Sequence, residues 1–213
     1  MSDKKAILVI GAGDATGGAI ARRFAREGYI ACVTRRSADK LQPLVEQIRA
    51  EGGQAHAFGS DARKEEAMVS LVETIERDIA PIEVAVFNIG ANVRFGITET
   101  TARVYQKVWE MACFSGFLMG RETARVMLPR GQGTIIFTGA TASMRGREGF
   151  AAFAGAKHAL RAHLRDHLAP YKIPGEIRFL ATLPAAPTGK LLKGVMKTMA
   201  QQPVDASPAP AMP

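Results

Sequence analysis

The sequence has few cysteines, only Cys32 and Cys113 among 213 residues, and neither belongs to a CxxC or metal-ligand spacing. Both lie among apolar residues, which is typical of reduced thiols in a protein core and predicts a cytoplasmic location. No apolar run reaches the roughly 18–20 residues that a membrane span needs. The apolar run before Gly11 has only five residues, too few for a signal peptide. The sequence therefore predicts no membrane association.

A dense basic block is also missing, although the formal net charge is +8 at pH 7. Lysine and arginine are scattered singly among acidic residues and are not interleaved with aromatic side chains, which argues against nucleic-acid binding. Attraction for a polyanionic cofactor, together with a solvated surface, accounts for the excess charge. The hydrophobic content of 47% and the length favour one globular domain, or one domain with an appendage.

The clearest signal is the segment 6–28. Five apolar residues, 6–10, lead directly into glycines at GxGxxxG spacing, and a helical pattern follows with Ala19, Ile20 and Phe24 on one apolar face. A buried parallel strand is a continuous apolar run, and glycines after it permit a tight turn. The free N–H groups at the start of the next helix then bind a pyrophosphate. The segment therefore predicts a dinucleotide-binding site.

The rest of the chain alternates strand and helix patterns. The further predicted strands are 29–33, 54–58, 82–87 and 134–137. The further predicted helices are 37–51, 98–114, 116–128 and 150–168. One more helix is predicted to follow Asp61, which can cap it. This order predicts an α/β fold, a Rossmann-like doubly wound parallel sheet with helices on both faces, in an NAD(P)-binding domain over residues 1–168.

The end of the second predicted strand bears on the choice of cofactor. In a Rossmann unit an acidic residue there accepts from the ribose 2′-hydroxyl, whereas arginine accommodates a 2′-phosphate. Here Arg35 and Arg36 follow the strand and no acidic residue takes that place. The sequence therefore predicts NADP(H) rather than NAD(H). The alternative is that both arginines are only loop charges.

Over about residues 5–160 the order of these parts resembles the short-chain dehydrogenase/reductase family. The Gly-rich turn, Asp61 after the third strand, the NxG after the fourth, the strand GTIIFTG and a lysine-bearing helix all fall in family order. The turn departs from the family pattern where Ile10 replaces a threonine and Ala15 a glycine. The resemblance implies that the cofactor contacts Gly11, Gly13 and Gly17 (pyrophosphate), Asp61 and Ala62 (adenine), and Asn88, Gly90 and Lys157 (ribose side).

The resemblance also implies where catalysis occurs, and there the sequence departs further. The family uses a Tyr-x-x-x-Lys pair, a serine before the tyrosine and an asparagine one helix earlier, with the phenol as general acid and base. Lys157 takes the lysine position, but Phe153 takes the tyrosine position and Ala140 the serine position. The asparagine position falls on Ala112, or on Cys113 in a register shifted by one.

Hydroxyl groups just past the fifth strand are the remaining candidates for binding a carbonyl oxygen. Thr138, Thr141 and Ser143 cluster there, and Ser143 is included as a candidate catalytic residue; the alternative is that they are turn and cap residues. Two interpretations stay open. One is a weak NADP-dependent oxidoreductase of carbonyl or secondary-alcohol substrates, its small-molecule substrate unidentified. The other is a non-catalytic cofactor-binding or interaction protein of the same fold.

The composition changes after residue 160, since eight of the eleven prolines lie at or beyond Pro170. Within about 160–195 the string YKIPGEIRFLATLPAAPTGKLLK is similar to the final motif of adenylate-forming enzymes of the acyl-CoA synthetase group, and the resemblance implies that Lys190 is the lysine of that motif. Residues 169–202 are predicted to be an appended segment, with a sixth strand at 176–183 beside the fifth. Residues 203–213 are predicted to be disordered. The dehydrogenase fold is thus expected to be truncated or altered at its C-terminal end.

The sequence also bears on a metal site and on oligomerisation. His163 and His167 are spaced i, i+4, as in a metal pair, but without a third ligand they are interpreted as surface residues, and no metal is predicted. The resemblance implies a possible homo-oligomer through the helices predicted at 98–128 and 150–168.

Overall fold

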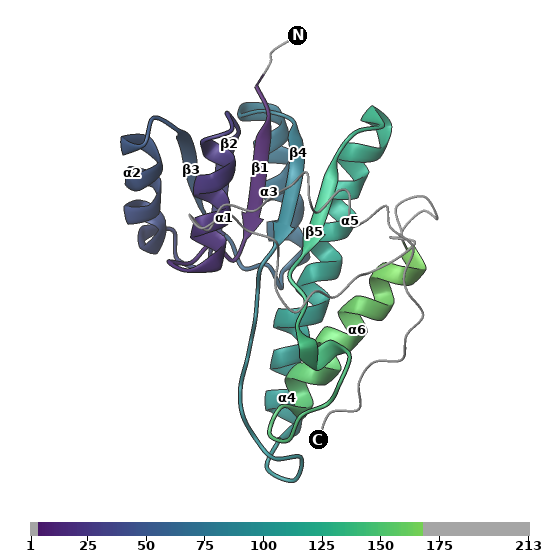
Figure 1. Ribbon diagram of the computed structural model, residues 1–213. Helices are drawn as coiled ribbons and strands as arrows, with labels where there is room; N and C mark the ends of the chain where they lie inside the picture. The colour runs from purple at the N-terminus through teal and green to yellow at the C-terminus, as the bar shows by residue number, and fades with distance from the viewer. Residues whose placement is uncertain (1–3, 168–213) are drawn as a thin grey trace, which may run out of the picture. The chain divides into compact units, whose positions relative to one another are not determined.

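The computed structural model describes residues 4–167, and of residues 163–167 it describes the helical backbone only. Five parallel strands form one sheet in the order β3-β2-β1-β4-β5 (Figure 1). The strands are β1 (Ala6–Ile10), β2 (Ile30–Arg35), β3 (Gln54–Gly59), β4 (Ile82–Phe87) and β5 (Thr134–Phe137). The central strand β1 is buried over its whole length, as its uninterrupted apolar sequence requires.

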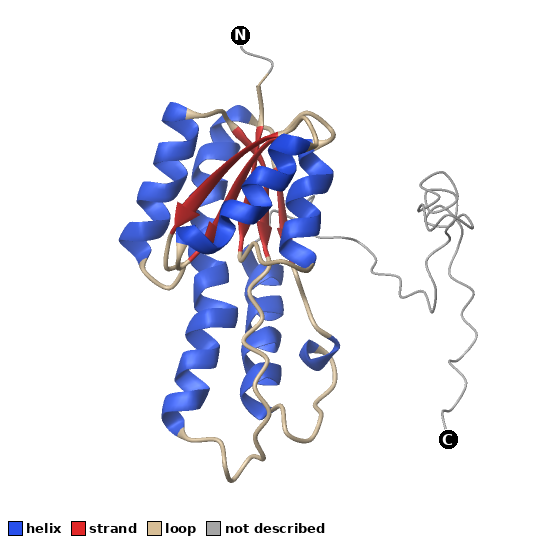
Figure 2. Ribbon diagram, turned by 90° about the vertical axis from the view of Figure 1, so that its left-hand side faces the viewer, coloured by secondary structure: helices blue, strands red, loops and turns tan. Residues whose placement is uncertain are grey.

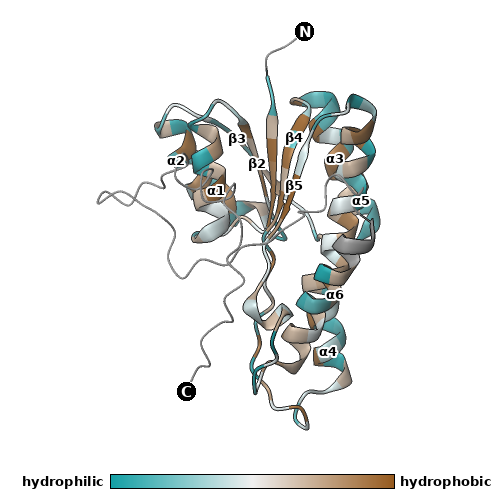
Figure 3. Cartoon of the chain, turned by 45° about the vertical axis from the view of Figure 1, so that its right-hand side comes forward, coloured by the Kyte–Doolittle hydropathy of each residue, from teal (hydrophilic) through white to brown (hydrophobic). Residues whose placement is uncertain are grey.

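Helices cover both faces of the sheet (Figure 2). They are α1 (Thr16–Ala25), α2 (Gln42–Ala50), α3 (Glu65–Asp78), α4 (Ala102–Trp109), α5 (Ser115–Met127) and α6 (Ala151–His167). Alternate residues of β1 point to opposite faces. Ile7 and Val9 pack with the residues of α1 and α2, whereas Leu8 and Ile10 pack with those of α3 to α6, and the apolar strands lie between the two layers (Figure 3). The predicted doubly wound parallel sheet is confirmed.

The register of the strands brings their carboxyl ends to one edge. Ile10 pairs with Thr34 of β2 and Phe87 of β4, and Phe87 pairs with Phe137 of β5. The residues that follow these ends therefore emerge side by side. In an open α/β sheet this edge is where ligands bind.

The helical run after β4 differs from the prediction in where it begins and in being continuous. It begins at Ala102 rather than 98, because the Thr101 side chain accepts a hydrogen bond from Val104 N and caps the helix there. The predicted break near residue 115 does not occur. A π-helical turn, Glu110–Phe114, joins α4 directly to α5.

The inner face of α1 agrees with the prediction in part. Ile20 and Phe24 pack against the core as expected, but Ala19 is exposed, and the buried residues are Gly17, Gly18, Ala21 and Ala25. An added Cβ at Gly18 would lie 2.5 Å from the Gly13 carbonyl oxygen. Small residues therefore let the helix approach the turn closely, and a pattern based on large apolar residues misses that face.

The last described strand, β5, lies at an edge of the sheet, and Ile136 is 41% exposed. The predicted sixth strand at 176–183, the appended segment 169–202 and the tail 203–213 lie outside the described residues. Within residues 4–167 no helix is long and apolar enough to cross a membrane. Cys32 and Cys113 are both free and buried, as expected of reduced core thiols.

Candidate functional site

The turn after β1 combines two glycines that the fold requires with one that faces open space. Gly11 has a φ of +84°, and an added Cβ there would lie 3.0 Å from the Asn88 carbonyl oxygen. At Gly17 an added Cβ would lie 2.5 Å from the Gly11 carbonyl oxygen. Nothing lies within 4 Å of the corresponding position at Gly13. The backbone at Gly13 is therefore open to a ligand, next to the start of α1, which no side chain caps.

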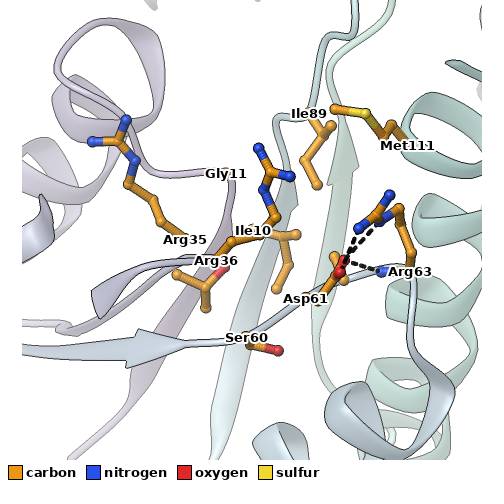
Figure 4. A pocket seen from close by; sticks show the side chains of 11 residues that line it. Ile10, Gly11, Arg35, Arg36, Ser60, Asp61, Arg63, Ile89 and Met111 are labelled. Atoms are coloured by element: carbon orange, nitrogen blue, oxygen red, sulfur yellow. Dashed lines mark hydrogen bonds and ion pairs between the residues drawn. The ribbon is translucent and has the colours of Figure 1, made fainter. Parts of the chain in front are cut away.

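A cavity of about 170 Å³ follows this turn along the carboxyl edge (Figure 4). Its lining comes from the ends of β1 and β2, the segment 60–63 after β3, and Ile89 and Met111. The surface is mostly apolar, but three arginines border it. Such a cavity suits the apolar faces of a nucleoside beside an anionic group.

The two arginines at the end of β2 have different surroundings. The Arg35 guanidinium lies 3.6 Å from the Asp14 carboxylate and donates to the Lys40 carbonyl at 3.3 Å. Arg36 forms no ion pair with any described residue, and the two side chains extend in different directions (Figure 4). Arg36 is therefore the cation at this edge that is available to a bound anion.

Asp61 does not cap the third helix, contrary to the prediction. α3 begins at Glu65, and the Asp61 carboxylate instead accepts two hydrogen bonds from the Arg63 guanidinium, at 2.9 and 2.6 Å, and one from Arg63 N (Figure 4). This pairing lowers the pKa of Asp61 to about 2. The carboxylate is thus held ionised beside the cavity, next to Ala62 in its lining.

Asn88 ties the turn after β1 to the end of β5. Its side-chain amide donates to the Gly11 carbonyl at 3.2 Å, and its side-chain oxygen accepts from the Thr138 hydroxyl at 3.0 Å. Gly90 lies beyond it, where an added Cβ would meet only Asn92 N, at 4.0 Å, and Ala91 has a φ of +67°. A non-glycine residue in that conformation is strained, and such strain is often found at functional sites.

Lys157 is buried behind the ends of β4 and β5, with 3% of its surface exposed. Its ammonium donates to the Ile89 and Thr138 carbonyl oxygens, each at 2.9 Å. Burial lowers the pKa of Lys157 to about 8, and Cys113 opposes that shift. Burial raises the pKa of the Cys113 thiol, which the Lys157 ammonium opposes. Of the two candidates for the asparagine position, Cys113 is thus the one that interacts with the lysine.

A second cavity, of about 200 Å³, lies between the loop after β5 and α6. Phe153 and Ala140 both line it, so the structure brings together the two positions at which the sequence departs from the family pattern. Thr141 lines it as well. The Ser143 hydroxyl is instead bonded to the Ala140 carbonyl at 2.7 Å.

Arg145 and Arg147 also line this second cavity, and the sequence analysis did not single them out. The only signal in the sequence is a pair of arginines on either side of Gly146, in a loop whose course the pattern does not specify.

A family model for short chain dehydrogenases matches residues 5–199. The chain belongs to the short-chain dehydrogenase family. The match continues beyond residue 160, where the resemblance drawn from the sequence ended. It therefore includes the segment of about 160–195 whose likeness to adenylate-forming enzymes stays a prediction.

Two curated relatives with named activities are less similar in sequence to this chain than one of the solved structures is. Gluconate 5-dehydrogenase of Gluconobacter oxydans is 29% identical over 72% of this chain and 60% of its own length. The 2,3-dihydro-2,3-dihydroxybenzoate dehydrogenase of Bacillus subtilis is 31% identical over 73% and 59%. A short-chain dehydrogenase from Rhodopseudomonas palustris is 53% identical, with a TM-score of 0.74 and 76% of each chain covered.

An actinorhodin polyketide ketoreductase, whose structure was determined with NADPH, is 25% identical with a TM-score of 0.73, covering 77% of this chain and 64% of that one. The chain thus spans about three fifths of the length of the curated relatives it matches. The family binds nicotinamide dinucleotides, and this chain has its glycine turn and both cavities along the carboxyl edge, where ligands of open α/β sheets bind.

No cluster of three or more metal-ligating side chains occurs among the described residues of this chain. His163 and His167 belong to the last turns of α6, and their side chains lie outside the described residues. Their interpretation as surface residues stays a prediction.

The pKa of Lys157 gives a testable dependence of stability on pH. The folded pKa of about 8 lies below the unfolded value of about 10.5, so between these values the unfolded chain binds more protons and stability rises with pH. Relative to Lys157→Met, the wild-type free energy of unfolding should rise by about 3 kcal/mol over that window. Urea denaturation of both proteins at several pH values measures the difference. A difference that stays constant with pH would contradict the burial of the ammonium.

Proposed function

We propose that this short-chain dehydrogenase binds NADP(H) along the carboxyl edge of β1, β2 and β4. The observation that carries the proposal is Arg36, a cation without an ion pair among the described residues, beside a mostly apolar cavity at the end of β2. Gly13 leaves room for the pyrophosphate, and Asp61 with Ala62 borders the space for the adenine. Gly90 and Lys157 would lie on the ribose side, while Asn88 holds the turn in place.

The preference for NADP(H) predicts unequal effects at the two neighbouring arginines. Arg36→Ser should weaken NADPH binding roughly ten- to hundredfold, because it removes a charge-assisted hydrogen bond to the 2′-phosphate, and should leave NADH binding unchanged. Arg35→Ser is the matched control, since Arg35 already contacts Asp14 and the Lys40 carbonyl. Titrations followed by ligand fluorescence and thermal melting measure both. Equal loss of NADPH and NADH affinity in Arg36→Ser would reject a role in reading the phosphate.

We further propose that cofactor binding is retained while turnover by the usual route of the family is reduced or lost. NADP(H) supplies a hydride when bound, and the chain must then supply a proton at the substrate oxygen. We take the second cavity, between the loop after β5 and α6, as the substrate-side cavity. Phe153 and Ala140 line it, and neither side chain can donate a proton. Lys157 is buried, is not among the residues that line this cavity, and donates its hydrogen bonds to two backbone carbonyls.

A weak oxidoreductase is the second candidate, favoured by the single hydroxyl of Thr141 in that cavity. An unperturbed hydroxyl is a poor proton donor, so slow reduction of a carbonyl substrate is the most this group supports. NADPH consumption by the wild-type protein above background would favour this candidate.

The substrate does not follow from the relatives, whose names include a sugar acid, a ring carboxylate and a polyketide. A homo-oligomer through the helical run 102–127 and α6, a sixth strand at 176–183 on β5, and an adenylate-enzyme-like segment at about 160–195 remain further proposals. Size-exclusion chromatography with light scattering tests the first of them.

A further inference from the structure

We propose that the substrate-side cavity binds a small organic carboxylate with an apolar body, held by Arg145 and Arg147. The inference rests on the proposed function in that this cavity is taken as the substrate side of the NADP(H) site. It names a ligand class that neither the family nor the glycine turn specifies, and it holds whether or not the bound molecule is turned over.

The charge at the cavity is of one sign. Two arginines, Arg145 and Arg147, are in its lining, and none of the residues that line it within the described part of the chain is acidic. Within residues 4–167 neither arginine forms an ion pair, and the nearby Glu148 does not line the cavity. The planar guanidinium matches a carboxylate and donates two parallel hydrogen bonds to it. Two such groups at one cavity therefore favour an anion with oxygen atoms on a planar group.

The remaining lining combines apolar side chains with the polar Asn92 and Thr141, and its apolar part separates this ligand from a simple inorganic anion. Phe150 and Phe153 contribute rings, and Ala140 and Ala142 contribute methyl groups. The Arg147 guanidinium lies 5.9 Å from the centre of the Phe150 ring, so one arginine sits over an aromatic face. Replacing the polar residues of the family pattern by Phe153 and Ala140 makes this wall more apolar. A ligand that joins an aromatic or aliphatic group to a carboxylate fits both the apolar side chains and the two arginines of the cavity.

The loop that carries the arginines is held by the loop after β4. Phe95 N donates to the Gly149 carbonyl at 2.9 Å, and Phe95 forms a parallel bridge with Phe150. Arg94 packs against Gly149, where an added Cβ would lie 3.0 Å from its Cγ. These contacts fix the arginine loop relative to the loop after β4 before a ligand arrives, which lowers the entropic cost of binding.

The test is isothermal titration calorimetry of the full chain with benzoate, with its uncharged analogue benzamide and with inorganic phosphate, each with and without saturating NADPH. Benzoate should bind saturably and weaken as salt is raised, whereas benzamide and phosphate should bind at least tenfold more weakly. Arg145→Gln and Arg147→Gln should each weaken benzoate about tenfold, because each removes a charge-assisted hydrogen bond. Both side chains are exposed, so the fold should be kept.

Arg23→Gln serves as the matched control, because Arg23 is an exposed arginine on α1, on the opposite face of the sheet, and should not change benzoate binding. Absence of saturable benzoate binding, equal affinity for benzamide, or equal weakening by Arg23→Gln would each overturn the inference. Phosphate binding as tight as that of benzoate would overturn the inference that the ligand needs an apolar body. Benzoate binding without NADPH binding would leave the carboxylate site standing and reject the proposed cofactor instead.

Discussion

Replacing Phe153 by tyrosine and Ala140 by serine together should produce NADPH-dependent reduction of carbonyl substrates at a rate roughly a hundredfold or more above wild type. A positioned general acid contributes about that factor. Both positions line the same cavity, and Phe153 precedes Lys157 by one helical turn on α6. The buried ammonium with its low pKa is therefore already placed behind the position of the new phenol. Loss of NADPH absorbance with a panel of aryl ketones and 2-oxo acids measures the rate.

The single variants Phe153→Tyr and Ala140→Ser separate the contributions of the two groups, and each should gain less than the double variant. Adding Lys157→Met to the double variant should remove the gain, because the lysine is the remaining member of the catalytic set. Wild-type turnover equal to that of the double variant would reject the proposal that the native cavity lacks a proton donor.

The glycines of the first turn should respond in opposite ways to the same substitution. Gly17→Val should destabilise the fold by about 3 kcal/mol or more, because the new Cβ would lie 2.5 Å from the Gly11 carbonyl oxygen and 2.8 Å from the Ala12 Cα. Gly13→Val should change stability by less than about 1 kcal/mol, since nothing lies within 4 Å of its Cβ position. It should nevertheless abolish NADPH binding, because a side chain there occupies the space of the pyrophosphate.

Urea denaturation and NADPH titration of both variants distinguish the two roles. Gly28→Val is a further control, since Gly28 has no neighbour within 4 Å either but lies at the other end of α1. Its φ of +86° makes that substitution strained, so it should lower stability and leave NADPH affinity unchanged. NADPH binding by Gly13→Val at wild-type affinity would show that the cofactor does not approach this turn.

The sheet was predictable because a parallel strand buried on both faces has an unmistakable composition. The first, fourth and fifth strands have the bounds that their apolar runs predicted, 6–10, 82–87 and 134–137. The helices were less predictable where local chemistry decides. Three threonines near residue 100 are all plausible caps, and only the hydrogen bond from Val104 N selects Thr101. A π-helical turn leaves no mark in an apolar pattern, so the continuous run through residue 115 was missed.

The candidate site was likewise predictable from the sequence on one side and not on the other. Its cofactor side follows from glycine spacing and from the strand ends, both of which are written along the chain. Its substrate side depends on how the loop after β5 folds back over α6, and that path depends on contacts such as Phe95 N with the Gly149 carbonyl, which are far apart in sequence. Asp61 shows a further limit. Its position after β3 was predicted correctly, but its carboxylate accepts hydrogen bonds from Arg63, two residues away, instead of capping the helix.

The π-helical turn Glu110–Phe114 sets the phase of the helical run that it interrupts. Its hydrogen bonds span five residues instead of four, so it holds one residue more than an α-helical turn. If the same residues were wound as a regular α-helix, the extra residue would rotate α4 by about 100° relative to α5. Val108 would then leave the buried face and Cys113 would change its position relative to Lys157. The π-helical turn is thus the local irregularity that keeps both helical segments facing the same core, although each has its own sequence pattern.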